Sequence, residues 1–459
     1  MSCNSGYGFV LLCQCLRVIP LTRHDKDMEN IQYNQIDNSG GDANTPASPF
    51  TGSLESKPSR IDASTFPHPP RGPNGTPPAT LENLIHLLSE GRFEAHFNVI
   101  KKRLEIRRHD GSIASMSQVV SFALLHGMGT GLLYQFVDEI AEKRPYNPIK
   151  EWINSVPWDG IDRLPAVFDA IRCADDYPVE LKEILCRRWL LSAAAAATVA
   201  NNFKTRGVLT LQGPQGIGKT TFISSLLPAG DLRNDYIKLD HHLDGSNKDS
   251  MIGAITHFIV EMGELDSSFR KDIARLKGFL TNGYDKLRRP YAKEESEYPR
   301  RTVFAATVND AKFLIDPTGN SRWWTIAITG LRPLDHIDLQ QLYSQLAAMV
   351  EQGEPWWLSP KEEALLATVN NKHRVETAIA GRVQELVDID RIGDPGGLAY
   401  TAIEVLRLIG VNNPSNAQCR ECGSALRELL GEPTRIKGRD RWRFHTVPFG
   451  KHDPDRAEY

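Results

Sequence analysis

The sequence lacks an uninterrupted apolar run long enough to span a bilayer, which argues against an integral membrane protein. Its formal net charge at pH 7 is only −3, so any binding to nucleic acid must come from local basic patches rather than from a generally cationic surface. Cysteine is sparse and odd in number, at seven residues. A disulfide framework is therefore not expected, and a reducing, cytoplasmic environment is favoured.

The length of 459 residues exceeds one compact core, so we expect two or three folded domains. Residues 1–79 are predicted to be a disordered Pro/Ser-rich region, because nine prolines fall between Pro46 and Pro78 among small polar residues. The remaining chain is divided by its patterns into a mostly helical accessory domain at 80–200, an α/β domain at 201–358, and a helical segment with a small module at 359–459.

Hydrophobic periodicity predicts the elements of the two larger domains. Apolar runs at 207–212, 257–260, 302–308 and 323–328 have the length of buried strands, with helix-like segments between them. This alternation predicts an α/β fold with a largely parallel sheet. In the accessory domain, the patterns predict a strand and an Asp-Gly turn at 103–113, and helices at 117–143, 148–155 and 178–200.

A glycine-rich segment follows the first of these strands. Residues 213–220 read GPQGIGKT, the complete G-x-x-x-x-G-K-[ST] pattern, between an apolar strand and a helical run. Glycines let backbone N–H groups surround phosphates, Lys219 supplies a charge to the β- and γ-phosphates, and the Thr220 hydroxyl is a ligand for Mg²⁺. The predicted ATP-binding residues are Gly213, Pro214, Gln215, Gly216, Ile217, Gly218, Lys219, Thr220 and Thr221.

Two glutamates follow the next strand. A carboxylate at the end of an apolar strand can hold Mg²⁺ or its water, and a second carboxylate nearby can polarise the attacking water. We assign Glu261 to the metal and Glu264 to water activation, although the sequence also allows the two roles to be exchanged.

Two further polar residues flank the later strands. Asn309 follows the strand at 302–308, where an amide could orient water and bind the γ-phosphate. Arg322 directly precedes the strand at 323–328 and is a candidate arginine finger for the ATP of a neighbouring subunit. An ordinary surface arginine is the alternative for Arg322.

The order of these motifs resembles the virulence-associated E (VirE-type) family over residues 145–330. The resemblance is carried by YNPIKEWINSVPWDGIDRL, GPQGIGKT, FIVEMGEL, DKLRRPY, RRTVFAATVN and FLIDPTGNSRWW. That family is related to phage primase-helicases and superfamily 3 helicases. The resemblance therefore implies an AAA+-like P-loop core and the nucleotide-site roles given above. The family usually has two arginines after Gly-Asn, whereas Ser321 takes the first place here, so Arg300 and Arg301 compete with Arg322 as the finger.

Two basic segments are candidate DNA contacts, with a solvated loop and a small packing domain as the respective alternatives. The first, residues 286–293, lies between the strand that precedes Glu261 and the strand that precedes Asn309. The second, residues 434–444, alternates basic and apolar residues around a glycine turn, as a β-hairpin does. Helices predicted at 400–409 and 415–430 precede it, giving a winged-helix-like order. The predicted DNA-binding residues are Lys286, Arg288, Arg289, Lys293, Arg435, Lys437, Arg441 and Arg443.

Together these features predict an ATP-dependent DNA helicase or replication-initiation ATPase of phage or mobile-element type. We expect a homo-oligomeric ring, a hexamer, because an arginine finger must reach the ATP of a neighbouring subunit. The expected partners are single-stranded or forked DNA and a possible separate primase. An ATP-gated DNA-binding switch or loader without unwinding activity needs the same site and stays open. A GTPase is disfavoured, because 247–249 and 371–373 do not form the N-K-x-D guanine signature.

Overall fold

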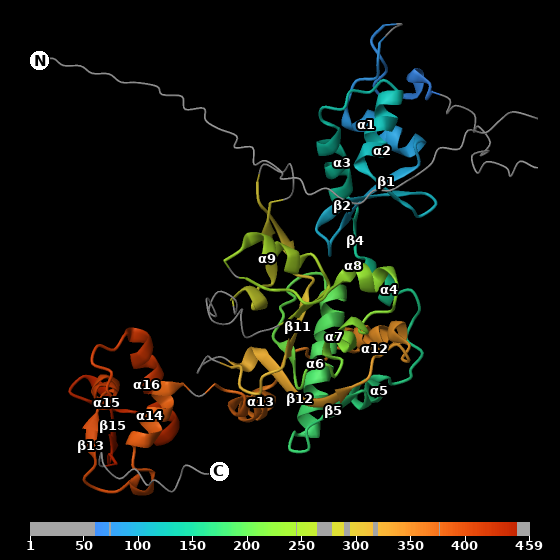
Figure 1. Cartoon of the computed structure of the whole chain (residues 1–459). Coiled ribbons are helices and arrows are strands. Elements are labelled where there is room, and N and C mark those ends of the chain that lie inside the picture. The colour runs from blue at the N-terminus through green and yellow to red at the C-terminus, as the bar shows by residue number, and fades with distance from the viewer. Residues whose placement is uncertain are drawn as a thin grey trace, which may run out of the picture. The chain divides into compact units, whose positions relative to one another are not determined.

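We describe the protein from a computed structural model, which covers residues 60–72, 75–244, 246–263, 278–288, 294–314, 320–375 and 377–447 (Figure 1). The chain divides into two units, residues 1–59 and residues 60–459, and every described residue belongs to the second. None of the helices in this described part combines the length and the apolar character that a membrane crossing requires.

The first folded part is a sheet of order β3-β2-β1-β4 packed against three helices. In β1, Phe93, Ala95 and Phe97 are buried while Glu94 and His96 between them are half-buried. This period of two is that of a strand with one face in the core. The strand predicted within 103–113 is present as β2, whereas β1 was not predicted, because its short alternation was not read as a strand. The elements are α1 (Leu81–Glu90), β1 (Phe93–Asn98), β2 (Arg103–Arg108), β3 (Ile113–Ala114), α2 (Met116–Leu125), α3 (Leu133–Glu142) and β4 (Pro145–Tyr146).

The segment before α1 packs onto this module. Phe66 is buried in its core, and the Asn83 side chain bonds to the backbone of His68 and Pro78. Asp62 caps the short helix Ala63–Thr65. The described residues between 60 and 79 thus differ from the predicted disorder, because one aromatic side chain and one buried amide hold them in place. The remainder of the predicted disordered region, including residues 1–59, lies outside the described residues.

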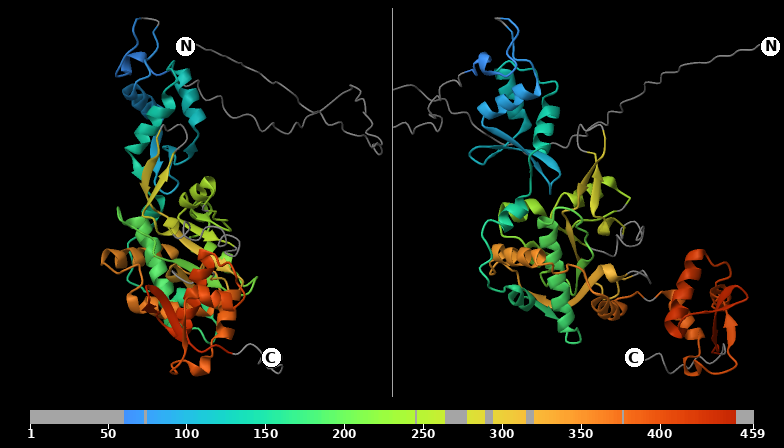
Figure 2. Two further views of the ribbon diagram at one scale, coloured as in Figure 1. Left: turned by 90° about the vertical axis from the view of Figure 1, so that its left-hand side faces the viewer. Right: turned by 180° about the vertical axis from the view of Figure 1, so that it is seen from behind.

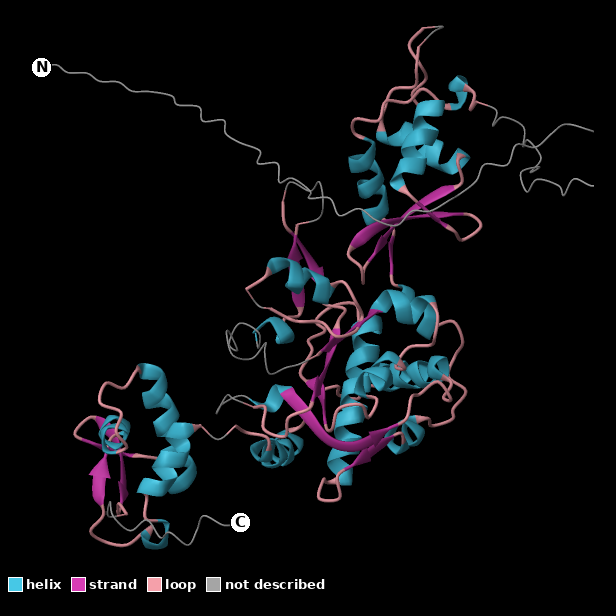
Figure 3. Ribbon diagram, in the orientation of Figure 1, coloured by secondary structure: helices cyan, strands magenta, loops and turns pink. Residues whose placement is uncertain are grey.

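A mixed α/β fold with a largely parallel sheet forms the middle of the chain, as predicted (Figure 3). The strand order is β5-β12-β6-β11-β8-β7. Five neighbouring strands run parallel, and β5 pairs antiparallel with β12 at one edge. The carboxyl ends of β6, β11 and β8 therefore meet at one edge of the sheet. The strands are β5 (Ile171–Cys173), β6 (Val208–Gln212), β7 (Ile237–Lys238), β8 (Ile259–Met262), β11 (Val303–Val308) and β12 (Trp323–Leu331).

The long helix α6 (Val179–Thr198) packs directly on this sheet. Its small residues from Ser192 to Ala197 are buried, and Trp189 donates its indole N–H to the Phe304 carbonyl at 2.7 Å. With β5, this helix joins the sheet core, so the division differs from the one predicted at residue 200. The other helices around the sheet are α4 (Pro148–Ile153), α5 (Leu164–Asp169), α7 (Lys219–Ser224), α8 (Asp231–Tyr236), α9 (Lys248–Ile255), α12 (Leu339–Glu351) and α13 (Pro360–Lys372).

A two-stranded hairpin is inserted between β8 and β11 in the sequence. Its strands β9 (Tyr284–Leu287) and β10 (Ser296–Pro299) pair antiparallel. Figure 2 shows this hairpin in yellow, extending away from the sheet in both views. The hairpin was not predicted from the sequence, because each strand is only four residues long and neither contains a run of apolar residues.

The C-terminal module contains three helices and a three-stranded sheet of order β13-β15-β14. The hairpin predicted over 434–444 is present, and its turn residues Lys437 and Gly438 both have positive φ, as two-residue hairpin turns require. Trp442 and Phe444 are buried in the module's core. The elements are α14 (Ala378–Leu386), β13 (Leu398–Tyr400), α15 (Ala402–Leu408), α16 (Asn416–Leu430), β14 (Thr434–Ile436) and β15 (Arg439–Phe444).

Candidate functional site

The glycine-rich loop connects β6 to α7 at the carboxyl edge of the sheet. Gly216 and Gly218 have φ of +83° and +89°, a conformation that side chains with a Cβ rarely adopt. At Gly213, a Cβ atom would lie 2.4 Å from the Ile328 carbonyl oxygen. Glycine is therefore needed at these three positions, at two for backbone conformation and at one for close approach.

Lys219 is held inside this loop by three acceptors. Its ammonium donates to the carbonyl oxygens of Gly213 at 2.7 Å and Pro214 at 2.8 Å, and to the Asn309 amide oxygen at 2.8 Å. Burial lowers the pKa of Lys219, while the charge of Glu261 opposes this shift. The structure thus brings together the predicted phosphate lysine and the predicted sensor.

Glu261 lies beside the loop on the buried strand β8, and the residue is 1% exposed. One carboxylate oxygen accepts hydrogen bonds from the Thr220 hydroxyl at 2.7 Å and from the Thr307 hydroxyl at 2.9 Å. The other accepts the Asp240 backbone N–H at 3.2 Å. The predicted Mg²⁺ ligands Thr220 and Glu261 are therefore adjacent.

Thr220 and Glu261 together fit a Mg²⁺ ion that takes most of its ligands from the substrate and from water. Among the described residues, no group of three or more His, Cys, Asp or Glu side chains could form a metal cage. Mg²⁺ commonly takes one or two protein oxygen ligands and completes its shell with phosphate oxygens and water. A hydroxyl next to a carboxylate at the phosphate loop matches that pattern.

Thr307 and Asp240 are residues of this edge that were not predicted from the sequence. Thr307 and Asn309 are two positions apart at the end of β11, and this spacing places side chains on the same face of a strand. Asp240 has φ of +50°, which is rare for a residue with a side chain, and a Cβ added at Gly263 would lie 2.1 Å from one of its carboxylate oxygens. The Asp240 carboxylate therefore lies against the end of β8. Glu264, the predicted water-activating residue, lies outside the described residues.

Arg322 lies at the opposite end of the sheet from the loop of its own chain. It directly precedes β12, whose first residue, Trp323, pairs with the first residue of β6, Val208. The loop begins after the last residue of β6, so the β6 strand, about 13 Å long at ~3.3 Å per residue, separates the two. Arg322 is half-buried, and its Nε atom has no hydrogen-bond partner in the described part of the chain.

The two competing arginines are engaged within the protein. The Arg300 side chain is fully buried and bonds to Asp285 through Nε at 2.7 Å and through a terminal nitrogen at 2.6 Å. Arg301 donates to carbonyl oxygens at the end of α6, those of Ala196 at 3.0 Å, Ala200 at 2.8 Å, and Val199. Arg322 is therefore the better candidate for a finger.

The predicted DNA contacts are distributed over the two hairpins. Lys286 and Arg288 are exposed on β9 and just after it, and Lys286 lies 3.9 Å from Glu297. Arg289 and Lys293 lie outside the described residues.

On the C-terminal hairpin, Arg435 and Lys437 are exposed. Arg441 instead forms an ion pair with Glu404 at 3.0 Å and donates to the Ala399 carbonyl at 2.6 Å. Arg443 is exposed and bonds weakly to the Gly397 carbonyl at 3.4 Å. Arg441 thus has a structural partner, which the alternating pattern could not show.

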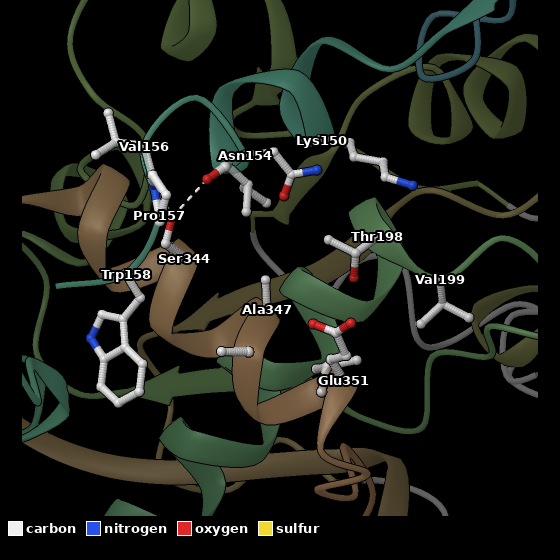
Figure 4. Close-up of a pocket in the computed structure, with 13 residues that line it drawn as sticks. Lys150, Asn154, Val156, Pro157, Trp158, Thr198, Val199, Ser344, Ala347 and Glu351 are labelled. Atoms are coloured by element: carbon white, nitrogen blue, oxygen red, sulfur yellow. Dashed lines mark hydrogen bonds between the residues drawn. The ribbon is translucent and has the colours of Figure 1, made fainter. Parts of the chain in front are cut away.

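A pocket of about 560 Å³ lies elsewhere, between α4, the end of α6 and α12 (Figure 4). On its wall, the Ser344 hydroxyl lies 2.6 Å from the Ile153 carbonyl oxygen and 2.9 Å from that of Val156. Gln340 and Gln341 bond to the same backbone segment. No residue of the glycine-rich loop lines this pocket, so it is not part of the nucleotide-site candidate.

Comparison with protein families supports the resemblance seen in the motifs. Residues 153–375 match the family described as virulence-associated protein E-like domain. This matched domain includes the glycine-rich loop, Glu261, Asn309 and Arg322, and it extends through α13. It covers somewhat less than half of the chain and leaves out the β1–β4 module and the C-terminal module.

Comparison with curated proteins gives no match. Among solved structures, the A form apo structure of the NrS-1 C-terminal region (305–718) is 13% identical, with a TM-score of 0.41, and the match covers 79% of this chain and 98% of that chain. A second apo structure of the region is 16% identical, with a TM-score of 0.35 and coverage of 79% and 98%.

Proposed function

We propose that the chain is a Mg²⁺-dependent P-loop ATPase that acts on DNA in replication of phage or mobile-element type. The observation that carries the proposal is the meeting of four side chains at one edge of the sheet. Lys219, on α7 after β6, bonds to Asn309 after β11, and Thr220 beside it bonds to Glu261 on β8. A lysine, a hydroxyl, a buried carboxylate and an amide are the groups that phosphoryl transfer from ATP requires. The virulence-associated protein E-like match covers all four residues.

The chemistry follows from the present bonds of these side chains. The phosphates of ATP would replace the Asn309 oxygen as a partner of the Lys219 ammonium, which leaves the Asn309 amide to orient the attacking water. Water attacks the γ-phosphorus, the bond to the ADP oxygen breaks, and the proton of the water passes to a carboxylate. We assign that carboxylate to Glu264. Mg²⁺ held by Thr220 and Glu261 would supply charge neutralisation for the phosphates.

We infer that hydrolysis takes place between subunits of a ring. Arg322 lies at the end of the sheet opposite to its own loop, which prevents it from reaching the γ-phosphate of the same chain. A finger at this position must therefore act on the nucleotide of a neighbouring copy. A closed ring, which we expect to be a hexamer, gives every site such a neighbour.

The C-terminal module is proposed as a winged-helix DNA-binding domain. Its elements follow the order α14, β13, α15, α16, β14, β15, with the two last strands forming the wing. Arg435 and Lys437 are exposed on that wing, where they could contact phosphates. Arg441 is removed from the predicted contacts because Glu404 already neutralises it.

Strand displacement tests this proposal. The wild-type chain and Lys219→Ala would be incubated with a forked duplex carrying a fluorescent strand, with and without ATP and Mg²⁺. Strand release by wild type only, and only with ATP, supports a helicase. ATP-dependent binding of the fork without release would favour a switch or loader. Absence of any ATP effect on binding or release would contradict the proposed function.

A further inference from the structure

Three charged side chains from distant parts of the sequence meet in a fully buried cluster. Lys102, in the turn between β1 and β2, lies 3.4 Å from Asp285 on β9, and Arg300, just after β10, lies 2.6 Å from the same carboxylate. The side chains of Lys102 and Arg300 are 0% exposed, and that of Asp285 is 1% exposed. The cluster therefore joins the β1–β4 module, the β9–β10 hairpin and the start of the chain leading into β11.

Lys102 is not needed to neutralise the carboxylate. Arg300 already contacts Asp285 through two nitrogens, so this pair alone is neutral, and Lys102 adds a second buried cation. Burial without full compensation is costly for an ammonium group, and it lowers the pKa of Lys102 to about 8. Buried charges of this kind are weak evidence for stability, but they can select one arrangement of the packed elements.

The geometry around Lys102 is specific as well. Lys102 has φ of +51°, and its ammonium also donates to the carbonyl oxygen of Ile255 at the end of α9, at 2.5 Å. A strained backbone conformation persists where its surroundings fix it. Here the ammonium bonds to Ile255 and lies at ion-pair distance from Asp285, so two different elements hold it. Such a contact allows little sliding of the module against the hairpin.

A further contact connects the module to the second strand of the hairpin, and a backbone bond closes the hairpin's base. The Phe97 ring on β1 stacks on the Tyr298 ring on β10, with centroids 5.5 Å apart. The backbone N–H of Arg300 donates to the Gly283 carbonyl at 2.8 Å, and this bond closes the base of the hairpin. The chain then passes through Arg301 and Thr302 into β11, after which Asn309 follows directly.

We propose that Lys102 is a positioning residue that holds the β9–β10 hairpin in a set orientation relative to β11. Nucleic acid bound at the hairpin and nucleotide sensed at Asn309 would then be coupled through a contact supplied by the β1–β4 module. The coupling to nucleic acid and nucleotide rests on the proposed function. The positioning of the hairpin does not, and it can be measured separately.

The test compares Lys102→Met with Lys101→Met. Lys102→Met leaves the neutral Asp285–Arg300 pair and fills similar volume, so the chain is expected to fold. Lys101 lies in the same turn but pairs with Asp235 on α8, 3.0 Å away, and is a matched control. Lys102→Gln, which can still donate to Ile255, is the second variant should Lys102→Met fail to fold.

Amide hydrogen exchange of the hairpin is the first readout, because it reports local opening in the absence of any ligand. We expect exchange in β9 and β10 to rise about fivefold or more in Lys102→Met, the lower end of usual coupling strengths. Exchange in α7 should stay unchanged, and Lys101→Met should behave as wild type. Unchanged exchange in the hairpin, or an equal rise in α7 or in the control, would overturn the proposal.

Stimulation of ATP hydrolysis by single-stranded DNA is the second readout. Lys102→Met should keep the basal rate within about twofold of wild type and lose stimulation by about fivefold or more. Faster amide exchange in the hairpin, together with unchanged stimulation of ATP hydrolysis by DNA, would overturn the coupling. If wild type hydrolyses no ATP at all, the proposed function fails, and the exchange result still decides whether Lys102 positions the hairpin.

Discussion

The Lys219 ammonium lies 2.8 Å from the Asn309 amide oxygen, although 90 positions separate the two residues in the sequence. Asn309→Ala should therefore leave nucleotide affinity close to wild type while turnover falls about a hundredfold, the usual cost of losing one preorganised donor at a reaction centre. Nucleotide titration and steady-state kinetics measure the two effects. Gln212→Ala is the control, since that side chain bonds to the Asn309 backbone, at 3.5 Å, and not to the Asn309 side chain. A normal turnover rate in Asn309→Ala would remove Asn309 from the mechanism.

The position of Arg322 predicts activity between subunits. Arg322→Ala should bind ATP normally and lose turnover, because its guanidinium would serve the neighbouring site. Mixing Arg322→Ala with Lys219→Ala should recover part of the activity, since some interfaces then combine an intact loop with an intact finger. Full activity of wild type in a dilute preparation shown to be monomeric by native mass would contradict this arrangement.

The wing of the C-terminal module predicts salt-dependent DNA binding. The triple variant Arg435→Ala, Lys437→Ala, Arg443→Ala should reduce the slope of log affinity against log salt by about one for each phosphate that these side chains neutralise in wild type. Basal ATP hydrolysis should be unchanged. Arg441→Ala should instead lower the melting temperature of the module, because it breaks the ion pair with Glu404. A salt slope that stays at the wild-type value in the triple variant would make the wing structural.

The burial of Lys102 predicts that the free energy of unfolding rises with pH. Its pKa is about 8 in the folded chain, against an ordinary value of 10.5, so the unfolded chain binds more protons between these values. The penalty of the buried cation is complete below pH 8 and is relieved as the pH rises towards 10.5. The groups that act on it are the carboxylate of Asp285 and the guanidinium groups of Arg300 and Arg301.

Denaturant unfolding at about pH 7, 8, 9 and 10 checks this expectation in wild type and Lys102→Met. The difference in free energy of unfolding between the two should shift in favour of wild type by an amount on the order of 3 kcal/mol across this range. A difference that does not change with pH would mean that Lys102 is not a buried cation.

The parts of the site that could be predicted from sequence are those with local signals. The glycine-rich loop is contiguous, and Glu261 and Asn309 lie at the ends of apolar strands that periodicity reveals. The strands β5 and β7 were missed because they are only three and two residues long. These short segments form strands because they pair with longer neighbours in the sheet, and their own sequences are too short to show a strand pattern.

Contacts between distant charges could not be predicted. Nothing in the local sequence distinguishes Lys102 from Lys101, or Arg300 from Arg301, yet the fold places one of each pair in a single buried cluster. The same applies to Arg441, which alternates with apolar residues like its neighbours but pairs with Glu404. These outcomes depend on which elements pack together, and tertiary packing decides them.

Hydrolysis of ATP by the purified chain tests the central claim most directly. Phosphate release would be measured with Mg²⁺ and ATP for wild type and Lys219→Ala, with and without single-stranded DNA. We predict Mg²⁺-dependent release by wild type and loss of both nucleotide binding and release in Lys219→Ala, because the phosphates lose the lysine of the loop. Hydrolysis at the wild-type rate in Lys219→Ala, or no binding of ATP by wild type, would contradict the account.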